Sequence, residues 1–185
     1  MSAQSHQFRI RHRRLCVSIA TTTYVACQIF FDARRDSDAL YHQYGVQLQT
    51  VLDCQILDLA LRKQGGLSSK YRTSLSNALE NYLPDLAKQF QFKEIKKQTV
   101  KRFAPEHGGD ADVWGKRPMD AGLLQYATFD VVFLRVLAAT MQAQLQPFYN
   151  NHAWAFSALN VASIRDLADA EITKENSSAA APAGF

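Results

Sequence analysis

Tyr126 and Asp130 are the pair of side chains in this sequence best suited to chemistry. They are four residues apart in the run 123–134, whose apolar residues recur at helical spacing. On an α-helix they therefore share one face, one turn apart. A carboxylate in that position can hold a divalent metal ion while the phenol orients a water molecule. The alternative is the margin of an amphipathic helix, with a Tyr that reaches toward solvent and a solvated Asp.

The composition is that of an ordinary globular domain. The 185 residues suffice for one domain with a substantial core, and 47% hydrophobic with 21% charged residues excludes a disordered or fibrous chain. No apolar run reaches the roughly 18 residues of a membrane span, so we expect a soluble protein. Cys16, Cys27 and Cys54 show no zinc-like spacing, and we expect them to be buried free thiols in a reducing compartment.

The net charge of +4 originates in the first 31 residues. They contain Arg9, Arg11, Arg13 and Arg14 and no acid, whereas the remaining 17 Lys and Arg are balanced by 17 Asp and Glu. This composition is similar to that of an organellar transit peptide. Because the chain is strand-like from Leu15 onward, a loop in front of a strand is the preferred interpretation. We expect an intracellular protein of the nucleus or cytoplasm, with an organelle as the alternative.

Strand-like and helical patterns alternate, which predicts an α/β sheet. Strands are predicted at residues 15–20, 23–27, 28–33 and 50–54, the first two as antiparallel neighbours. Helices are predicted at residues 39–44, 56–62, 71–82, 86–92 and 153–170. Asp120 is expected to cap the helix that carries Tyr126 and Asp130. Residues 173–185 form a low-complexity tail that we expect to be disordered.

Three segments, in this order, resemble the motifs of the DEDDy family of 3′-to-5′ exonucleases, which includes ribonuclease D and the Werner-type exonuclease domains. Residues 31–41 are similar to the second motif, in which a carboxylate opens a helix after a strand. Residues 114–119 resemble the Trp-x-x-Arg-Pro-Leu lead-in, and residues 126–130 match the third motif, Tyr-x-x-x-Asp. The resemblance covers residues 15–145 and is closest to the Egalitarian-like branch, which includes RNA-binding members whose catalytic set has decayed.

The resemblance implies a ribonuclease H-like exonuclease domain over residues 15–172, with a mixed sheet flanked by helices. It implies hydrolysis of RNA or DNA from the 3′ end with Mg²⁺ or Mn²⁺, and no membrane partner. In this family two ions held by four carboxylates activate a water and stabilise the leaving oxygen. By their place in the motifs, Asp36 and Asp130 are the implied metal ligands, and Tyr126 orients the attacking water.

Basic and aromatic side chains near these motifs are candidates for contact with nucleic acid: Arg34, Arg35, Trp114, Lys116 and Arg117. The basic run 93–102, with Lys96, Lys97, Lys101 and Arg102, offers a second path for a phosphate backbone, although most such runs are solvated faces. Trp114 is more often a packing anchor than a stacking platform. Asp53, at a strand edge, is expected to close a turn or cap a helix.

The first motif of the family, Asp-x-Glu, has no counterpart here. The first acidic residue is Asp32, so two of the four metal-binding carboxylates are missing, and residues 1–14 precede the strand that should follow the motif. The predicted strands 23–27 and 28–33 also abut, where a crossover needs about a dozen residues. We expect a truncated or misassembled gene sequence that lacks the first strand and one crossover helix. The alternatives are a catalytically inactive RNA-binding or scaffold protein of the same fold, and an α/β domain with accidental motif matches.

Overall fold

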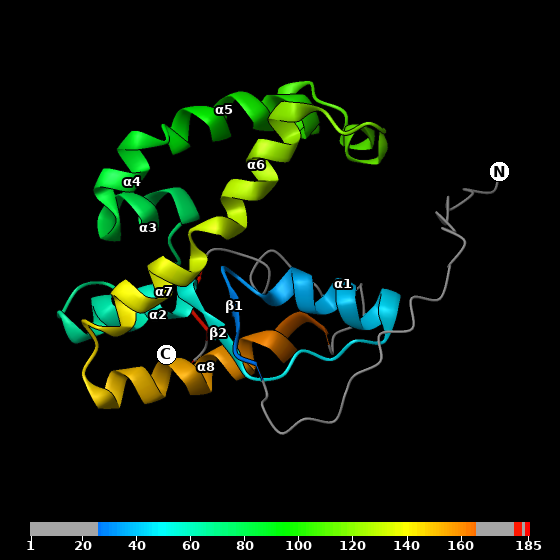
Figure 1. Cartoon of the computed structure of the whole chain (residues 1–185). Coiled ribbons are helices and arrows are strands. Elements are labelled where there is room, and N and C mark those ends of the chain that lie inside the picture. Colours follow the sequence, from blue (N-terminus) through cyan, green and yellow to red (C-terminus); the bar gives the residue numbers. More distant parts are fainter. Residues whose placement is uncertain (1–25, 166–179, 183) are drawn as a thin grey trace.

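The computed structural model describes residues 26–165, 180–182 and 184–185, and this part of the chain is mostly helical (Figure 1). In chain order the elements are β1 (Gln28–Phe30), α1 (Arg34–Tyr44), β2 (Val51–Asp53), α2 (Cys54–Gln64), α3 (Leu75–Tyr82), α4 (Pro84–Gln89), α5 (Phe92–Phe103), the 3₁₀ turns η1 (Pro105–His107) and η2 (Ala111–Gly115), α6 (Ala121–Val132), α7 (Leu134–Gln142) and α8 (Pro147–Arg165).

The sheet of the described residues consists of β1 and β2, which pair in parallel with Ile29 opposite Leu52. Helix α1 connects them, as a parallel pair requires a crossover. The α/β prediction therefore holds in a reduced form, with both strands shorter than the predicted 28–33 and 50–54. The other two predicted strands lie outside the described residues, except for Ala26 and Cys27, which are not in a strand.

The core lies where α8 packs against α1, α2 and β2, and α7 against α2 (Figure 1). Helix α2 is buried along most of its length, which fits its nearly continuous apolar sequence. Its Ile56 and Leu57 are inaccessible to solvent, as are Leu137 and Met141 of α7. These helices fix the position of the α1 start and of the end of α6.

Several helix ends follow local sequence signals. Helix α1 ends at Gly45, whose φ of 67° is a left-handed conformation that favours glycine, as the sequence predicted. Helix α3 begins after Ser74, whose side chain accepts a hydrogen bond from the Asn77 N–H. Asp120 caps α6, also as predicted, by accepting from the N–H groups of Gly122 and Leu123.

Helices α3 to α6 form an arm above the core in Figure 1, and α6 leads back to α7 with a bend at Phe133. The segment Ala121–Gln142, which covers α6 and α7, is long and apolar enough to cross a membrane, by length and composition alone. From the sequence we expected no membrane-spanning segment. The finding is weak evidence for a membrane span, because a core helix of a soluble protein passes the same test.

The described residues of the tail lie against the domain. The N–H of Ala181 donates to the carbonyl of Lys70, and the Arg72 guanidinium donates to the carbonyl of Ala180. Cys54 is buried with a free thiol, as predicted, whereas Cys27 is exposed and Cys16 lies outside the described residues. Burial raises the pKa of the Cys54 thiol, so it is an inert thiol.

Candidate nucleic-acid interface

Tyr126 and Asp130 lie on one face of α6, as their spacing predicts. The Tyr126 ring packs against Phe103 at the end of α5 and against Trp114 in η2, with ring centroids 5.6 and 6.2 Å apart. Phe103 and Trp114 also contact each other, at 5.2 Å. We call these three residues the aromatic cluster. All three rings are only partly buried, so the cluster offers aromatic surface to a ligand.

The Asp130 carboxylate faces Lys96 of α5, with 3.9 Å between Nζ and Oδ1. Burial raises the pKa of Asp130, and the Lys96 charge and the Tyr126 hydroxyl oppose that rise. Burial, followed by the Asp130 charge, raises the pKa of Tyr126 to about 12. The phenol is therefore protonated at neutral pH and acts as a donor.

Asp36 lies in the first turn of α1 and is exposed. Partial desolvation and the neighbouring Asp32 carboxylate raise its pKa. Asp32 itself is paired with Arg34, whose Nε and Nη2 donate to its two oxygens at 2.6 and 2.8 Å. Arg34 is 5% exposed, so this side chain orders the start of α1, whereas Arg35 is exposed to solvent.

The fully buried Asp53 holds the loop that leads into α1. Its Oδ1 accepts from the N–H groups of Asp32 and Gln55, both at 2.9 Å, and its Oδ2 accepts from the Ala33 N–H at 3.0 Å and from Asn160 Nδ2 at 2.7 Å. Burial raises the pKa of Asp53 against these hydrogen bonds. The prediction that Asp53 caps a helix is confirmed, since the Gln55 bond caps α2.

Sequence reasoning missed the partners that complete this arrangement. Asn160 and Ser157 of α8 reach Asp53, the latter through its hydroxyl to the Asp53 N–H at 3.0 Å. Arg72 joins the same set, since its Nη1 and Nη2 donate to Gln55 and Asn160 at 3.0 and 2.8 Å. The sequence contains one sign of this arrangement. Ser157 and Asn160 are polar, three residues apart and in an otherwise apolar helix, and this spacing places them on one face.

The described residues do not fit a two-metal centre. No three His, Cys, Asp or Glu side chains of the described ranges come close enough together to hold a metal ion. Asp36 has Asp32 as its charged neighbour, and Asp130 has Lys96. The sequence adds no acid before Asp32. Because divalent ions need several oxygen ligands in one place, we derive no hydrolytic step from this geometry.

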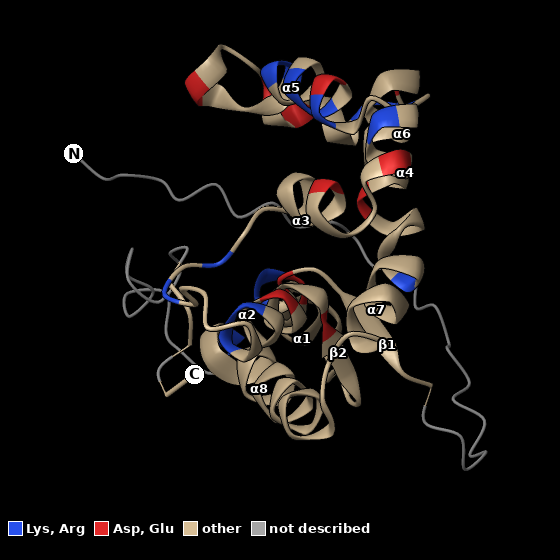
Figure 2. Ribbon diagram, turned by 90° about the vertical axis from the view of Figure 1, so that its left-hand side faces the viewer, with Lys and Arg blue, Asp and Glu red and all other residues tan. Residues whose placement is uncertain are grey.

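The remaining candidate contacts lie beside the aromatic cluster. Lys116 is exposed and 3.8 Å from Asp110, a surface ion pair. Arg117 is exposed and donates to the backbone carbonyls of Trp114 and Lys116 at 2.9 and 2.8 Å. Figure 2 shows Lys and Arg gathered on α5, which carries Lys96. Lys116 and Arg117 follow Trp114 in the chain, and Lys96 approaches the Tyr126 ring.

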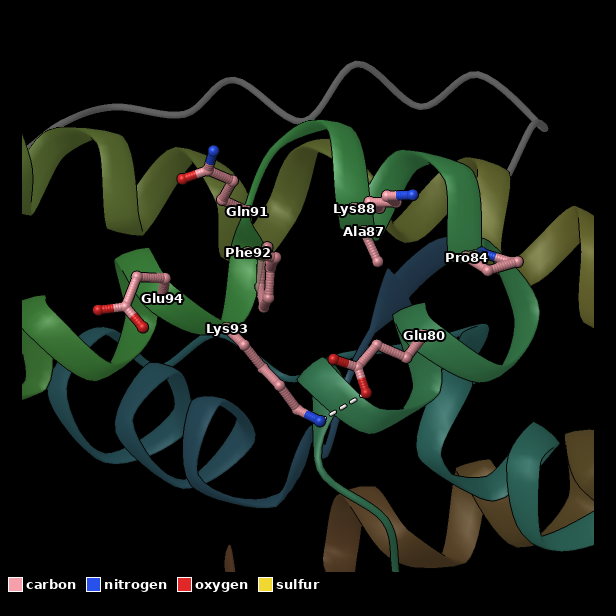
Figure 3. Close-up of a pocket in the computed structure, with 8 residues that line it drawn as sticks. All are labelled: Glu80, Pro84, Ala87, Lys88, Gln91, Phe92, Lys93 and Glu94. Carbon is pink, nitrogen blue, oxygen red and sulfur yellow. Dashed lines mark hydrogen bonds and ion pairs between the residues drawn. The ribbon is translucent and has the colours of Figure 1, made fainter.

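A pocket of about 370 Å³ opens between α3, α4 and the start of α5 (Figure 3). Its lining combines Glu80 and Glu94 with Lys88 and Lys93, and the Lys93–Glu80 ion pair at 2.5 Å lies across it. The pocket is linked to the aromatic cluster through Lys96. This side chain faces both the Phe92 ring in the pocket lining and the Tyr126 ring of the cluster. The mixed charge of the pocket gives no preference for a phosphate.

The comparison with solved structures assigns the fold. It finds the crystal structure of Trypanosoma brucei RNase D in complex with GMP, at a TM-score of 0.58 and 24% sequence identity. The match covers 80% of this chain and 43% of that one, so this chain spans less than half the length of RNase D. The predicted likeness to the RNase D fold is confirmed, whereas the DEDDy assignment and the exonuclease activity stay predictions. No protein-family model and no curated protein matches the chain.

Proposed function

We propose that this domain binds the 3′ end of single-stranded RNA or DNA. The observation that carries the proposal is the aromatic cluster of Phe103, Trp114 and Tyr126, partly exposed and flanked by basic residues. Aromatic rings stack on any base, and Lys and Arg neutralise the phosphates between bases. The likeness to the RNase D fold supports the same substrate class. We expect the phosphate contacts to come from Lys116 and Arg117, which follow Trp114 in the chain, and from the exposed Arg35 at the start of α1.

The test is the affinity of the full chain for short fluorescein-labelled oligoribonucleotides and oligodeoxyribonucleotides, measured by fluorescence anisotropy. Trp114→Ala should weaken binding by about fivefold or more, because one stacked base is worth about 1–3 kcal/mol. Phe148→Ala is the matched control, since this exposed ring lies on α8 rather than in the aromatic cluster. Equal affinities of the two variants would contradict the proposal.

The second candidate is hydrolysis of the bound 3′ end with Mg²⁺ or Mn²⁺. It is favoured by Tyr126 and Asp130 on one helix face and by the exposed Asp36 at the start of α1. Incubation of a 3′-labelled oligonucleotide with Mn²⁺ separates the candidates. Release of labelled nucleotide that Asp130→Asn abolishes supports the exonuclease, and binding without release supports the binding protein.

A further inference from the structure

Lys96 lies at the centre of the candidate nucleic-acid interface. In the sequence it is only one of several positive charges in the basic run 93–102. Phe92 and Phe103 lie at the two ends of α5 and contact Phe129 and Tyr126 of α6, respectively. Helix α6 therefore folds back along α5. In this register the middle of α5 faces the Tyr126–Asp130 side of α6, and Lys96 extends from that point.

The Lys96 ammonium has three neighbours from both helices. Its Nζ is 5.8 Å from the Tyr126 ring centroid, 6.0 Å from the Phe92 ring centroid and 3.9 Å from Asp130 Oδ1. The distance to Asp130 is too long for a hydrogen bond, so the ammonium keeps N–H donors for another acceptor. The side chain is 30% exposed, which leaves a path from solvent.

We propose that Lys96 is the fixed cation of this interface: it takes the place beside Asp130 that a divalent ion would need, and binds a backbone phosphate of single-stranded nucleic acid. This proposal rests on the proposed function. The Lys96 Nζ lies 3.9 Å from Asp130 Oδ1, and its positive charge repels a second cation from that carboxylate. A nucleic acid whose bases stack on Trp114 and Tyr126 brings its phosphates to the Lys96 ammonium.

The first consequence concerns metal binding in the absence of nucleic acid. Mn²⁺ is titrated into the isotope-labelled chain, and its paramagnetic broadening of the Tyr126 and Asp130 backbone amide signals is recorded by NMR. Lys96→Gln should show this broadening at Mn²⁺ concentrations about tenfold lower than wild type, because one repelling charge is gone. Lys97→Gln, one residue on, controls for net charge and should resemble wild type. Adding Asp130→Asn to Lys96→Gln should abolish the gain.

The second consequence concerns nucleic acid. The wild-type affinity for the fluorescein-labelled oligoribonucleotide should be the same in EDTA as in Mg²⁺, and Lys96→Gln should weaken it by about tenfold, more than Lys97→Gln does. Binding that requires Mg²⁺, or equal losses in the two variants, would overturn the role of Lys96. Broadening in wild type at the Mn²⁺ concentrations that affect Lys96→Gln would overturn it as well. Absence of oligonucleotide binding in every chain would instead contradict the proposed function, and the Mn²⁺ titration would still report on Lys96.

Discussion

At the scale of single residues, Asp53 has more structural partners than any residue that the motifs single out. Each of its two carboxylate oxygens accepts two hydrogen bonds. Three of the four donors are backbone N–H groups, and the fourth is the side-chain amide of Asn160. Asp53→Asn replaces one oxygen by an NH₂ group, which faces two N–H donors in either orientation of the amide. We expect a loss of about 2 kcal/mol or more in the free energy of unfolding, measured by urea denaturation.

Asp110→Asn is the control for this prediction. Asp110 also caps a helical turn, but it is exposed and accepts one backbone N–H, from Asp112. Its substitution should change the free energy of unfolding by no more than about 0.5 kcal/mol, as most surface changes do. If the two variants lose similar stability, the four hydrogen bonds of Asp53 do not stabilise the fold beyond an ordinary cap.

The residues of the interface show what sequence could and could not predict. The shared face of Tyr126 and Asp130 and the caps at Asp53 and Asp120 follow from spacing and side-chain chemistry within a few residues. The contact between Lys96 and Asp130 depends on the register of two helices, and the bond from Asn160 to Asp53 spans 107 residues. The spacing of Ser157 and Asn160 shows only that they share a face of the helix, and packing decides which partners Asn160 and Lys96 meet.

At the scale of elements, the turn between α5 and α6 sets the geometry of the aromatic cluster. A Cβ at Gly109 would lie 2.6 Å from the Phe103 backbone nitrogen and from the Arg102 carbonyl carbon, closer than backbone atoms can accommodate. Gly109→Ala should therefore push the loop away from the end of α5. We expect a loss of about 1–3 kcal/mol in the free energy of unfolding, as overpacking typically causes, and weaker oligonucleotide binding.

Gly115→Ala tests whether this effect is specific. Gly115 lies at the end of η2, next to Trp114, and a Cβ there meets nothing within 4 Å. This variant should retain both the stability and the oligonucleotide affinity of the wild-type chain, measured by urea denaturation and fluorescence anisotropy. A Gly109→Ala chain as stable as Gly115→Ala would show that the loop moves without cost.

Elements were predictable to different degrees for a physical reason. Helices α2 and α6 have apolar residues at helical spacing and a capping Asp, so their existence follows from the sequence. Helix α1 begins at Arg34, five residues before the predicted residue 39, because the bonds from Asp32 and Ala33 to Asp53 fix its first turn. Strands β1 and β2 have three residues each, too few for a period to specify their length.

At the scale of the whole molecule, α8 and the tail meet around His152. Its ring packs on Phe156 and Phe185, with centroids 4.5 and 5.3 Å away, and its Nε2 is buried without a hydrogen-bond partner in the described part of the chain. Burial, then the charge of Lys63, lowers the pKa of His152 below its ordinary 6.5. The folded chain therefore favours the neutral ring.

This shift has a definite sign. As the pH falls below about 6.5, the unfolded chain binds a proton at His152 before the folded chain does, so the free energy of unfolding declines until the folded pKa is passed. His152→Phe keeps an aromatic ring in the contact and removes the titration. Urea denaturation at about pH 7.5 and about pH 5.5 should show a smaller acid-side loss for this variant than for wild type. Equal losses in His152→Phe and wild type would mean that the titration of His152 does not cause the loss of stability between these two pH values.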